Sequence, residues 1–261
     1  YISKEYPKQI EFDKSLIKIF TIDIETTAEG GFPDVENPTE EIICLTIKNQ
    51  SNKQIITWGT KPFLVKQDNV TYVECANEKQ LLMEFFKFWM KNYPDVITGW
   101  NTKFFDIPYL CNRTKRLVGD KVINKLSPWG LIEEEKLTVR GRQQTIFKIT
   151  GISNLDYLDL YIKFIPTRQE SYKLDYIAKV ELGGDGKDNN PYETFREWYK
   201  NDFQSFVEYN IKDVELVDKL EDKLRLIELI MTMAYEAKVN YTDVFSEVRL
   251  WDTLIYNHLL K

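Results

Sequence analysis

The sequence predicts an α/β fold in which a mixed sheet is flanked by helices. Strand-like apolar segments lead the chain, and segments of helical periodicity follow them. This order favours a sheet whose first three or more strands pair antiparallel, with helices added later on its faces. The 261 residues contain no internal repeat, no low-complexity tract and no shift in composition, so we expect one domain over 1–261.

The first strand is expected at 16–25, where LIKIFTIDIE is apolar and rich in isoleucine. Gly, Pro and Asn mark the following segment, 26–41, as a loop. Two more strands are expected at 42–49 and 53–59, joined by a short turn. The segment 77–94 is expected to be a helix that Asn77 caps and Pro94 ends, because its apolar residues share one face: Leu81, Leu82, Phe85, Phe86 and Trp89.

The second part of the chain is expected to be mostly helical. A short buried strand at 95–100 precedes it, and the alternating pattern around Arg-Gly-Arg predicts a β-hairpin at 136–149. The segment YLDLYIKF is read as a further strand or buried segment at 157–164. Helices are expected at 107–117, 171–182, 202–238 and 241–261, with a flexible loop at 183–191.

Composition and charge exclude several classes of protein. A net charge of −6 argues against coating duplex DNA by counterion release alone, although it permits contact with phosphates through bound cations. The three cysteines, Cys44, Cys75 and Cys111, are odd in number and widely spaced, which indicates buried or free thiols of a reducing compartment rather than a disulfide or zinc framework. No membrane partner is expected, since no apolar run is long enough to span a bilayer and no leader is apparent. A dehydrogenase or a kinase is excluded because neither glycine-rich phosphate loop is present.

Asp23 and Glu25 are the most informative residues of the chain. Side chains two apart on a strand point to one face, so these two acids converge at the end of an apolar strand. Like charges on a buried face repel unless a cation lies between them. The pair therefore predicts a metal site. The alternative is that the strand ends here and both acids are solvated.

Two more acids occupy similar settings. Asp106 follows two aromatic residues at the start of a predicted helix, where the alternative role is an N-cap. Asp213 follows Tyr209 by four residues in a predicted helix, so the two lie on one face. The alternative for Asp213 is a surface carboxylate. Each of these residues has a common alternative role, but four acids and a tyrosine in this order form a more specific pattern than any one of them.

That pattern resembles the DEDD exonuclease superfamily in its tyrosine-containing branch. The segments ITGWNTKFFDIPYLCNR, GISNLDYLDLYIKF and YNIKDVE are similar to the proofreading exonuclease domain of family B DNA polymerases from T-even-type phages. The resemblance implies a ribonuclease H-like (DnaQ-like) fold with an inserted β-hairpin. No SLYPS-like or YxDTDS motif is present and the chain begins at Tyr1, so we expect part of a longer or split enzyme without its polymerase domain.

The resemblance implies 3′–5′ hydrolysis of DNA with two Mg²⁺ or Mn²⁺ ions. Oxygen ligands suit these cations, and such an ion pair can activate water and stabilise the leaving oxygen. Asp23 would bridge the ions, Glu25 and Asp213 would hold one of them, and Asp106 would support the other. Tyr209 would hydrogen-bond the attacking water or the phosphate.

Other residues are candidates for DNA contact. Phe32 and Phe105 could stack on terminal bases, and Asn101 could contact the backbone, although a structural role is as plausible for each. The resemblance implies that Lys187 neutralises phosphate and that the hairpin with Arg140 and Arg142 separates primer from template. The alternative for the hairpin is a charged, solvated element with no role in strand separation. The expected partners are a single-stranded or frayed 3′ end and a polymerase domain in cis or in trans, in the cytoplasm of an infected bacterial host cell.

Two alternatives to a proofreading domain stay open. One is a stand-alone DEDD single-strand nuclease or ribonuclease, which a comparison of DNA and RNA substrates would identify. The other is a non-catalytic module that binds nucleic acid or docks a polymerase, against which the four intact acids argue.

Overall fold

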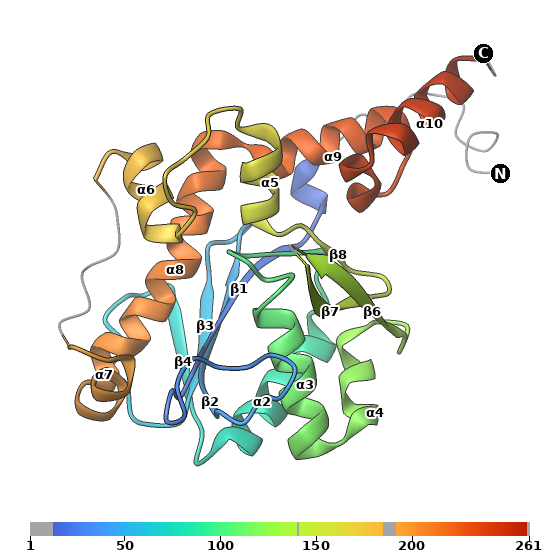
Figure 1. Ribbon diagram of the computed structural model, residues 1–261. Coiled ribbons are helices and arrows are strands. Elements are labelled where there is room, and N and C mark those ends of the chain that lie inside the picture. Colours follow the sequence, from blue (N-terminus) through green and yellow to red (C-terminus); the bar gives the residue numbers. More distant parts are fainter. Residues whose placement is uncertain (1–12, 140, 185–191, 260–261) are drawn as a thin grey trace.

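The computed structural model describes residues 13–139, 141–184 and 192–259. Its centre is a six-stranded sheet in the order β4-β3-β2-β1-β5-β8 (Figure 1). β1 pairs antiparallel with β2, and β2 with β3, while the pairs β3–β4, β1–β5 and β5–β8 are parallel. The strands are β1 (Ile19–Thr26), β2 (Ile42–Asn49), β3 (Ile55–Gly59), β4 (Val70–Glu74), β5 (Val96–Thr98) and β8 (Ser153–Asn154). The predicted mixed sheet and its antiparallel leading strands are confirmed, and β4 and β8 are additions.

Helices cover both faces of this sheet. On one face, Phe20, Ile22 and Ile24 of β1 pack in a common core with residues of α2 (Glu78–Lys91) and α3 (Asp106–Val118). The opposite face carries α8 (Phe203–Leu224), which packs across β1, β2 and β3. Asn77 caps α2 as predicted, because its side chain accepts the backbone N–H of Gln80 at 3.0 Å. Alternation along β1 therefore turns its odd-numbered side chains toward α8.

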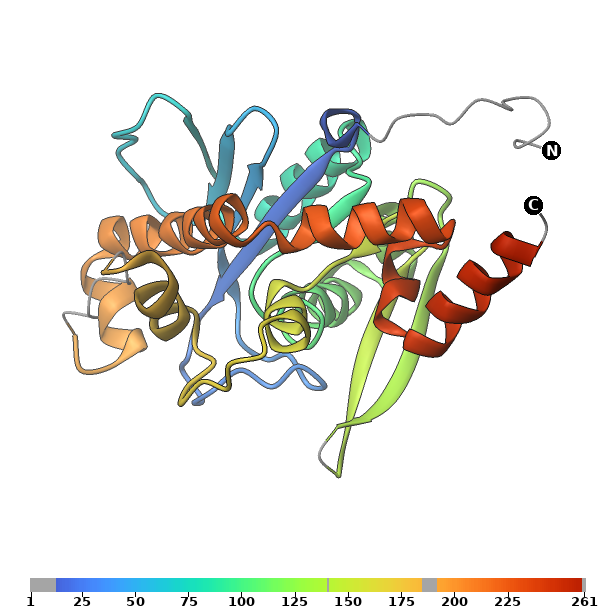
Figure 2. The same ribbon diagram turned by 90° about the horizontal axis from the view of Figure 1, so that it is seen from above.

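The predicted hairpin is present and is longer than expected. It consists of β6 (Ile132–Val139) and β7 (Arg142–Ile149), which form a separate two-stranded sheet. In Figure 2 the hairpin extends away from the rest of the molecule, beyond the helices at its base. The smaller helical elements are η1 (Lys14–Leu16), α4 (Asp120–Ile123), η2 (Asn124–Leu126), α6 (Leu174–Leu182), α7 (Phe195–Asn201), η3 (Tyr241–Phe245) and α10 (Glu247–Leu259).

The strand prediction for 157–164 is wrong, because the segment is helix α5 (Tyr157–Phe164). Tyr157, Leu160 and Tyr161 are its buried residues, and their spacing is helical rather than alternating. Asp156 caps the helix by accepting the backbone N–H of Leu158 at 3.0 Å. The reading as a buried segment holds for these three residues.

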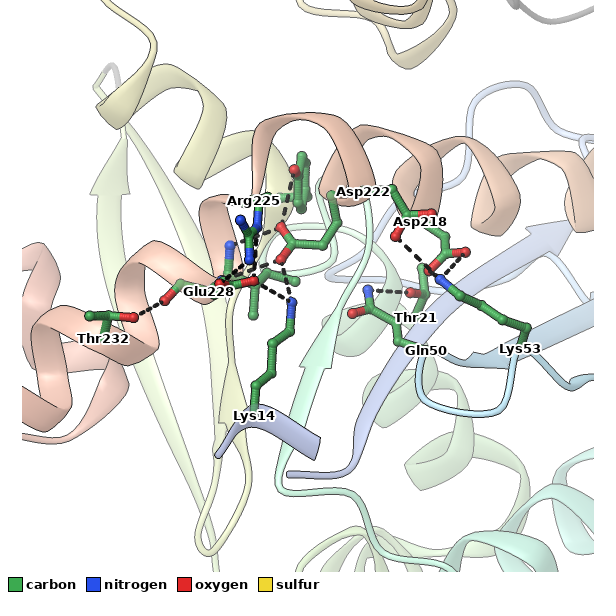
Figure 3. A network of polar contacts seen from close by, with 12 residues as sticks. Lys14, Thr21, Gln50, Lys53, Asp218, Asp222, Arg225, Glu228 and Thr232 are labelled. Atoms are coloured by element: carbon green, nitrogen blue, oxygen red, sulfur yellow. Dashed lines mark hydrogen bonds and ion pairs between the residues drawn. The ribbon is translucent and has the colours of Figure 1, made fainter. Parts of the chain in front are cut away.

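The predicted helix 202–238 is two helices, α8 and α9 (Leu226–Ala237), joined at Arg225. Arg225 has a left-handed backbone, with φ of 53°, which no L-residue sustains inside a helix. Glu221 stabilises the joint by accepting the N–H groups of Ile227 at 2.9 Å and Glu228 at 3.2 Å. Figure 3 shows Lys14 reaching this joint, where its Nζ lies 2.9 Å from Glu221.

A buried ion pair joins α8 to the sheet. Asp218 of α8 forms an ion pair with Lys48 of β2 at 2.8 Å. Figure 3 shows its second partner, Lys53 of the following turn, also at 2.8 Å. Lys48 and Asp218 are both buried, so removing either would leave an uncompensated charge in the interior. All three cysteines are buried free thiols, as expected. Among the described residues, no helix combines the length and apolarity that a bilayer crossing requires.

Candidate active site

The end of β1 presents the first two acids of the site. Asp23 and Glu25 are both partly exposed and alternate with the buried residues Ile22 and Ile24. Asp23 lies opposite Thr46 of β2, and Glu25 lies opposite Cys44, before the register shifts at Thr26. Because the even-numbered side chains enter the core with α2 and α3, the two acids face α8. The predicted convergence on one face of the strand is confirmed.

Helix α8 brings the third acid to this face. Asp213 is buried on α8, and one oxygen from each of Asp23, Glu25 and Asp213 lies within 4.8 Å of the others. Three carboxylates at such distances repel one another strongly, and a divalent cation relieves that repulsion. Carboxylate oxygens are also the ligands that Mg²⁺ and Mn²⁺ prefer. The residues therefore fit a hard divalent cation by both their charge and their donor atoms.

Asp106 lies beside this group but is not one of the three converging acids. It is the first residue of α3, is 2% exposed, and accepts the backbone N–H of Ile24 at 3.0 Å through Oδ1. Strand β5 pairs with β1 only as far as Thr21. The N–H of Ile24 therefore lies beyond the paired part of β1, and the Asp106 carboxylate accepts it in place of a β5 residue. The alternative role as an N-cap is wrong, since Phe105 occupies the N-cap position.

Burial gives Asp106 unusual acid–base properties. It raises the pKa of this carboxyl to about 8, and the neighbouring charges of Asp156 and Asp213 act in the same direction. The hydrogen bond from Ile24 opposes this shift without cancelling it. A nearby cation would reverse the shift, because it favours the ionised form.

Tyr209 is one helical turn before Asp213 and is held by aromatic neighbours. Its ring meets those of Trp198 and Phe195 of α7 edge-on, with centroids 4.9 Å and 6.0 Å away. Edge-to-face contacts of this kind fix the plane of the ring. The helix α7 was not predicted, and it supports the one tyrosine in the candidate set.

The loop between β5 and α3 places Asn101 and Phe105 near Asp106. Asn101 has a left-handed backbone, with φ of 68°, and donates its N–H to Asp156 Oδ1 at 3.0 Å. Asp156 Oδ2 accepts the N–H of Lys103 at 2.9 Å. Burial raises the pKa of Asp156 to about 6. Asp156 therefore shapes this loop, although the sequence reasoning did not single it out.

Two of the candidate DNA-contact residues lie together. Phe32, in the loop after β1, is 89% exposed, and its ring centroid lies 6.0 Å from that of Phe105. Phe105 also stacks on Tyr109 at 5.7 Å, so it is half-buried while Phe32 presents its ring to solvent. An exposed aromatic ring beside a half-buried one offers a surface on which a base can stack.

The match to known proteins agrees with this geometry. Residues 2–177 match the model of the DNA polymerase family B exonuclease domain. The chain belongs to this family. Its sheet, flanking helices and β6–β7 hairpin constitute the ribonuclease H-like fold that the resemblance implied, and the domain is an exonuclease.

Viral polymerases are among the relatives of this exonuclease domain. It is 33% identical to the DNA-directed DNA polymerase of Escherichia phage RB69 and 32% identical to that of Enterobacteria phage T4. Each alignment covers 99% of this chain and 31% of the phage enzyme, so the chain spans about a third of those relatives. The DNA polymerase delta catalytic subunit of Candida albicans is 26% identical, over 87% of this chain and 22% of that subunit.

The remaining predicted residues lie on or near the hairpin of the exonuclease domain, or outside the described residues. Arg142 begins β7 opposite Val139, next to the hairpin tip. Arg140 and Lys187 lie outside the described residues. The base of the hairpin is not uniformly basic, because Lys148 pairs with Glu135 at 2.5 Å.

One buried amide escaped the sequence reasoning altogether. Asn210 is fully buried on α8 and donates Nδ2–H to Asp23 Oδ2 at 2.6 Å. A signal for it does exist in the sequence. Asn210 interrupts the apolar stripe that α8 turns toward the sheet, which consists of Phe206, Val207, Ile211, Val214 and Val217. A polar residue in such a stripe requires a buried hydrogen-bond partner.

Proposed function

We propose that this exonuclease domain removes nucleotides one at a time from the 3′ end of DNA and thereby edits mispaired ends. The observation that carries the proposal is the convergence of Asp23, Glu25 and Asp213, whose oxygens lie within 4.8 Å of one another. An anionic phosphodiester approaches three acids only when cations offset their charge. The site is therefore suited to metal-dependent hydrolysis of a phosphate ester.

The proposed cofactors are two Mg²⁺ or Mn²⁺ ions. Asp23, Glu25 and Asp213 would hold one ion, and Asp23 together with Asp106 would hold the other. When bound, such a pair activates the attacking water and stabilises the charge that develops on the leaving 3′ oxygen. The high pKa of Asp106 in the metal-free protein, about 8, means that loading this position releases a proton near neutral pH.

Tyr209 is proposed to orient the attacking water or the phosphate. Tyr209 lies one helical turn before Asp213, and its ring packs against Trp198. Its hydroxyl therefore has a restricted range of positions. Phenols ordinarily have a pKa of about 10, which makes them poor bases at neutral pH. The role of Tyr209 is therefore to donate or accept a hydrogen bond rather than to remove the proton.

The DNA end is proposed to bind as a single strand. Phe32, exposed beside Phe105, would stack on a terminal base, and Asn101 would contact the adjoining backbone. The hairpin with Arg140 and Arg142 would keep the complementary strand away, and Lys187 would neutralise a phosphate. Because a paired end must melt before it enters such a site, mispaired ends react first.

We further propose that residues 1–261 act as one unit with a polymerase domain in cis or in trans. The relatives that match the whole chain are named DNA-directed DNA polymerases and are about three times as long. Since those relatives are phage enzymes, the proposed place of action is the cytoplasm of an infected bacterium.

A comparison of substrates tests this function. Four 5′-labelled substrates would be digested with Mg²⁺: single-stranded DNA, single-stranded RNA of the same sequence, and duplex DNA with a matched or a mismatched 3′ end. We expect single-stranded DNA and the mismatched duplex to shorten faster than the matched duplex, and RNA to shorten slowly.

Other outcomes of this comparison would support one of the alternative functions. Equal rates on matched and mismatched ends would contradict proofreading, and RNA degraded as fast as DNA would favour a ribonuclease. Binding without cleavage would favour a docking module. The control is a variant that combines Asp23→Ala with Glu25→Ala, which should retain the fold and lose cleavage.

A further inference from the structure

The amide of Asn210 lies at the centre of a buried polar chain behind the acids. Its Nδ2–H donates to Asp23 Oδ2 at 2.6 Å. Its Oδ1 accepts the hydroxyl of Thr46 and, at 3.3 Å, the thiol of Cys44. The Thr46 hydroxyl lies 2.8 Å from that of Thr57. Asn210, Thr46 and Thr57 are all fully buried, so water does not compete for these bonds.

The register of the sheet explains this chain. Asp23 of β1 lies opposite Thr46 of β2, which lies opposite Thr57 of β3. The three side chains therefore form one row across the face that α8 covers. Asn210 comes down from α8 onto this row. Residues of three strands and one helix thus determine how the Asn210 amide is oriented.

The direction of every hydrogen bond in the row follows from chemistry. An ionised carboxylate only accepts, so the amide nitrogen of Asn210 must face Asp23 and its oxygen must face Thr46. The Thr46 hydroxyl donates its single hydrogen to the amide oxygen of Asn210, so in the bond between the two threonines Thr57 is the donor. All donors therefore point toward Asp23.

We infer that Asn210 is a positioning residue for the metal site, holding one oxygen of Asp23 so that the other faces the cations. This inference rests on the proposed function. The amide is neutral, so it adds no charge to three acids that already lie within 4.8 Å, and its donor does not depend on pH. Outer partners of this kind orient metal ligands, and their loss typically weakens metal binding 10- to 100-fold.

The test measures Mn²⁺ affinity by electron paramagnetic resonance, without DNA and without turnover. We expect Asn210→Leu to weaken Mn²⁺ binding about 10- to 100-fold. Thr46→Val should weaken it less, since Asn210 keeps its bond to Asp23 but loses a constraint. The matched control is Gln50→Leu, which removes a buried amide that donates to Thr21 at 3.2 Å. Its Mn²⁺ affinity should equal that of the parent.

A near-isosteric variant tests for positioning rather than packing. Asn210→Asp preserves shape, but the new carboxyl can donate to Asp23 only while protonated and repels it once ionised. Parent affinity should rise with pH as the ligands lose protons. In Asn210→Asp that rise should be flattened or reversed, which a purely structural role would not produce. If Asn210→Leu failed to fold, this profile and Thr46→Val would decide.

The possible failures are distinguishable. A parent protein that bound no Mn²⁺ would overturn the proposed function, and this inference with it. Parent-like affinity in folded Asn210→Leu, together with a parent-like pH profile in Asn210→Asp, would overturn this inference alone.

Discussion

Replacing Asp213 by asparagine should make the metal-free protein more stable. The change preserves the shape of a buried side chain and removes one of three negative charges within 4.8 Å of one another. At that distance a pair of charges repels by about 3 kcal/mol at an effective dielectric constant of about 20, and by about 1 kcal/mol in bulk water. Because Asp23 and Glu25 are partly exposed, and because Asp213 loses contacts of its own, we expect a net gain of about 1–3 kcal/mol in unfolding free energy.

Mg²⁺ should reverse this order of stability. A ligand that binds only the folded state stabilises it by about 2.7 kcal/mol at 100 times its dissociation constant. The parent should gain this stabilisation, while Asp213→Asn, which has lost a carboxylate ligand, should gain much less. The two stability curves therefore cross as Mg²⁺ is added.

Thermal unfolding with EDTA and with Mg²⁺ measures both effects. In EDTA the melting temperature of Asp213→Asn should exceed that of the parent by roughly 2–12 °C. The matched control is Glu215→Gln, on the same helix and half-buried, which should change stability by less than about 0.5 kcal/mol. A variant less stable than the parent in EDTA, or stabilised by Mg²⁺ as much as the parent, would refute the reasoning.

Four further outcomes are expected. In pH–rate profiles, Tyr209→Phe should slow cleavage much less than Asp213→Ala does. His258→Ala should leave the rate unchanged, since this exposed histidine lies on α10 rather than on an element of the site; a lower rate in His258→Ala would contradict the role of Tyr209. Shortening the hairpin tip around 139–142 should reduce digestion of duplex ends more than that of single strands, and equal losses on both would exclude strand separation. Because burial raises the pKa of Asp156 to about 6 from 3.8, its contribution to stability is present at low pH and is lost as pH rises from about 4 through 6; urea unfolding at several pH values should show this slope in the parent and not in Asp156→Asn.

The sequence predicted the sheet and the acids because both follow from local patterns. Asp23 and Glu25 converge through the two-residue period of a strand, and Tyr209 and Asp213 through the period of a helix. The sequence did not reveal which face α8 would cover. That face depends on contacts between distant residues, such as the ion pair of Lys48 with Asp218.

The errors arise where contacts beyond the local sequence decide the structure. The segment 157–164 is short, and eight residues that mix apolar and polar side chains fit a strand or a helix until packing decides. No glycine or proline in the sequence marks the break at Arg225. The turn is stabilised instead by a buried glutamate of the preceding helix, Glu221. Asn210 was overlooked because an asparagine in a helix acquires a role only from its neighbours across the sheet, Asp23 and Thr46.

Digestion of 5′-labelled single-stranded DNA tests the central claim most directly. The parent protein and the combined Asp23→Ala and Glu25→Ala variant would be compared with Mg²⁺ and with EDTA, after circular dichroism has shown that both are folded. We expect the parent with Mg²⁺ to shorten the labelled strand stepwise from its 3′ end, and EDTA or the two substitutions to abolish this. Equal digestion in EDTA, or by the folded double variant, would contradict it.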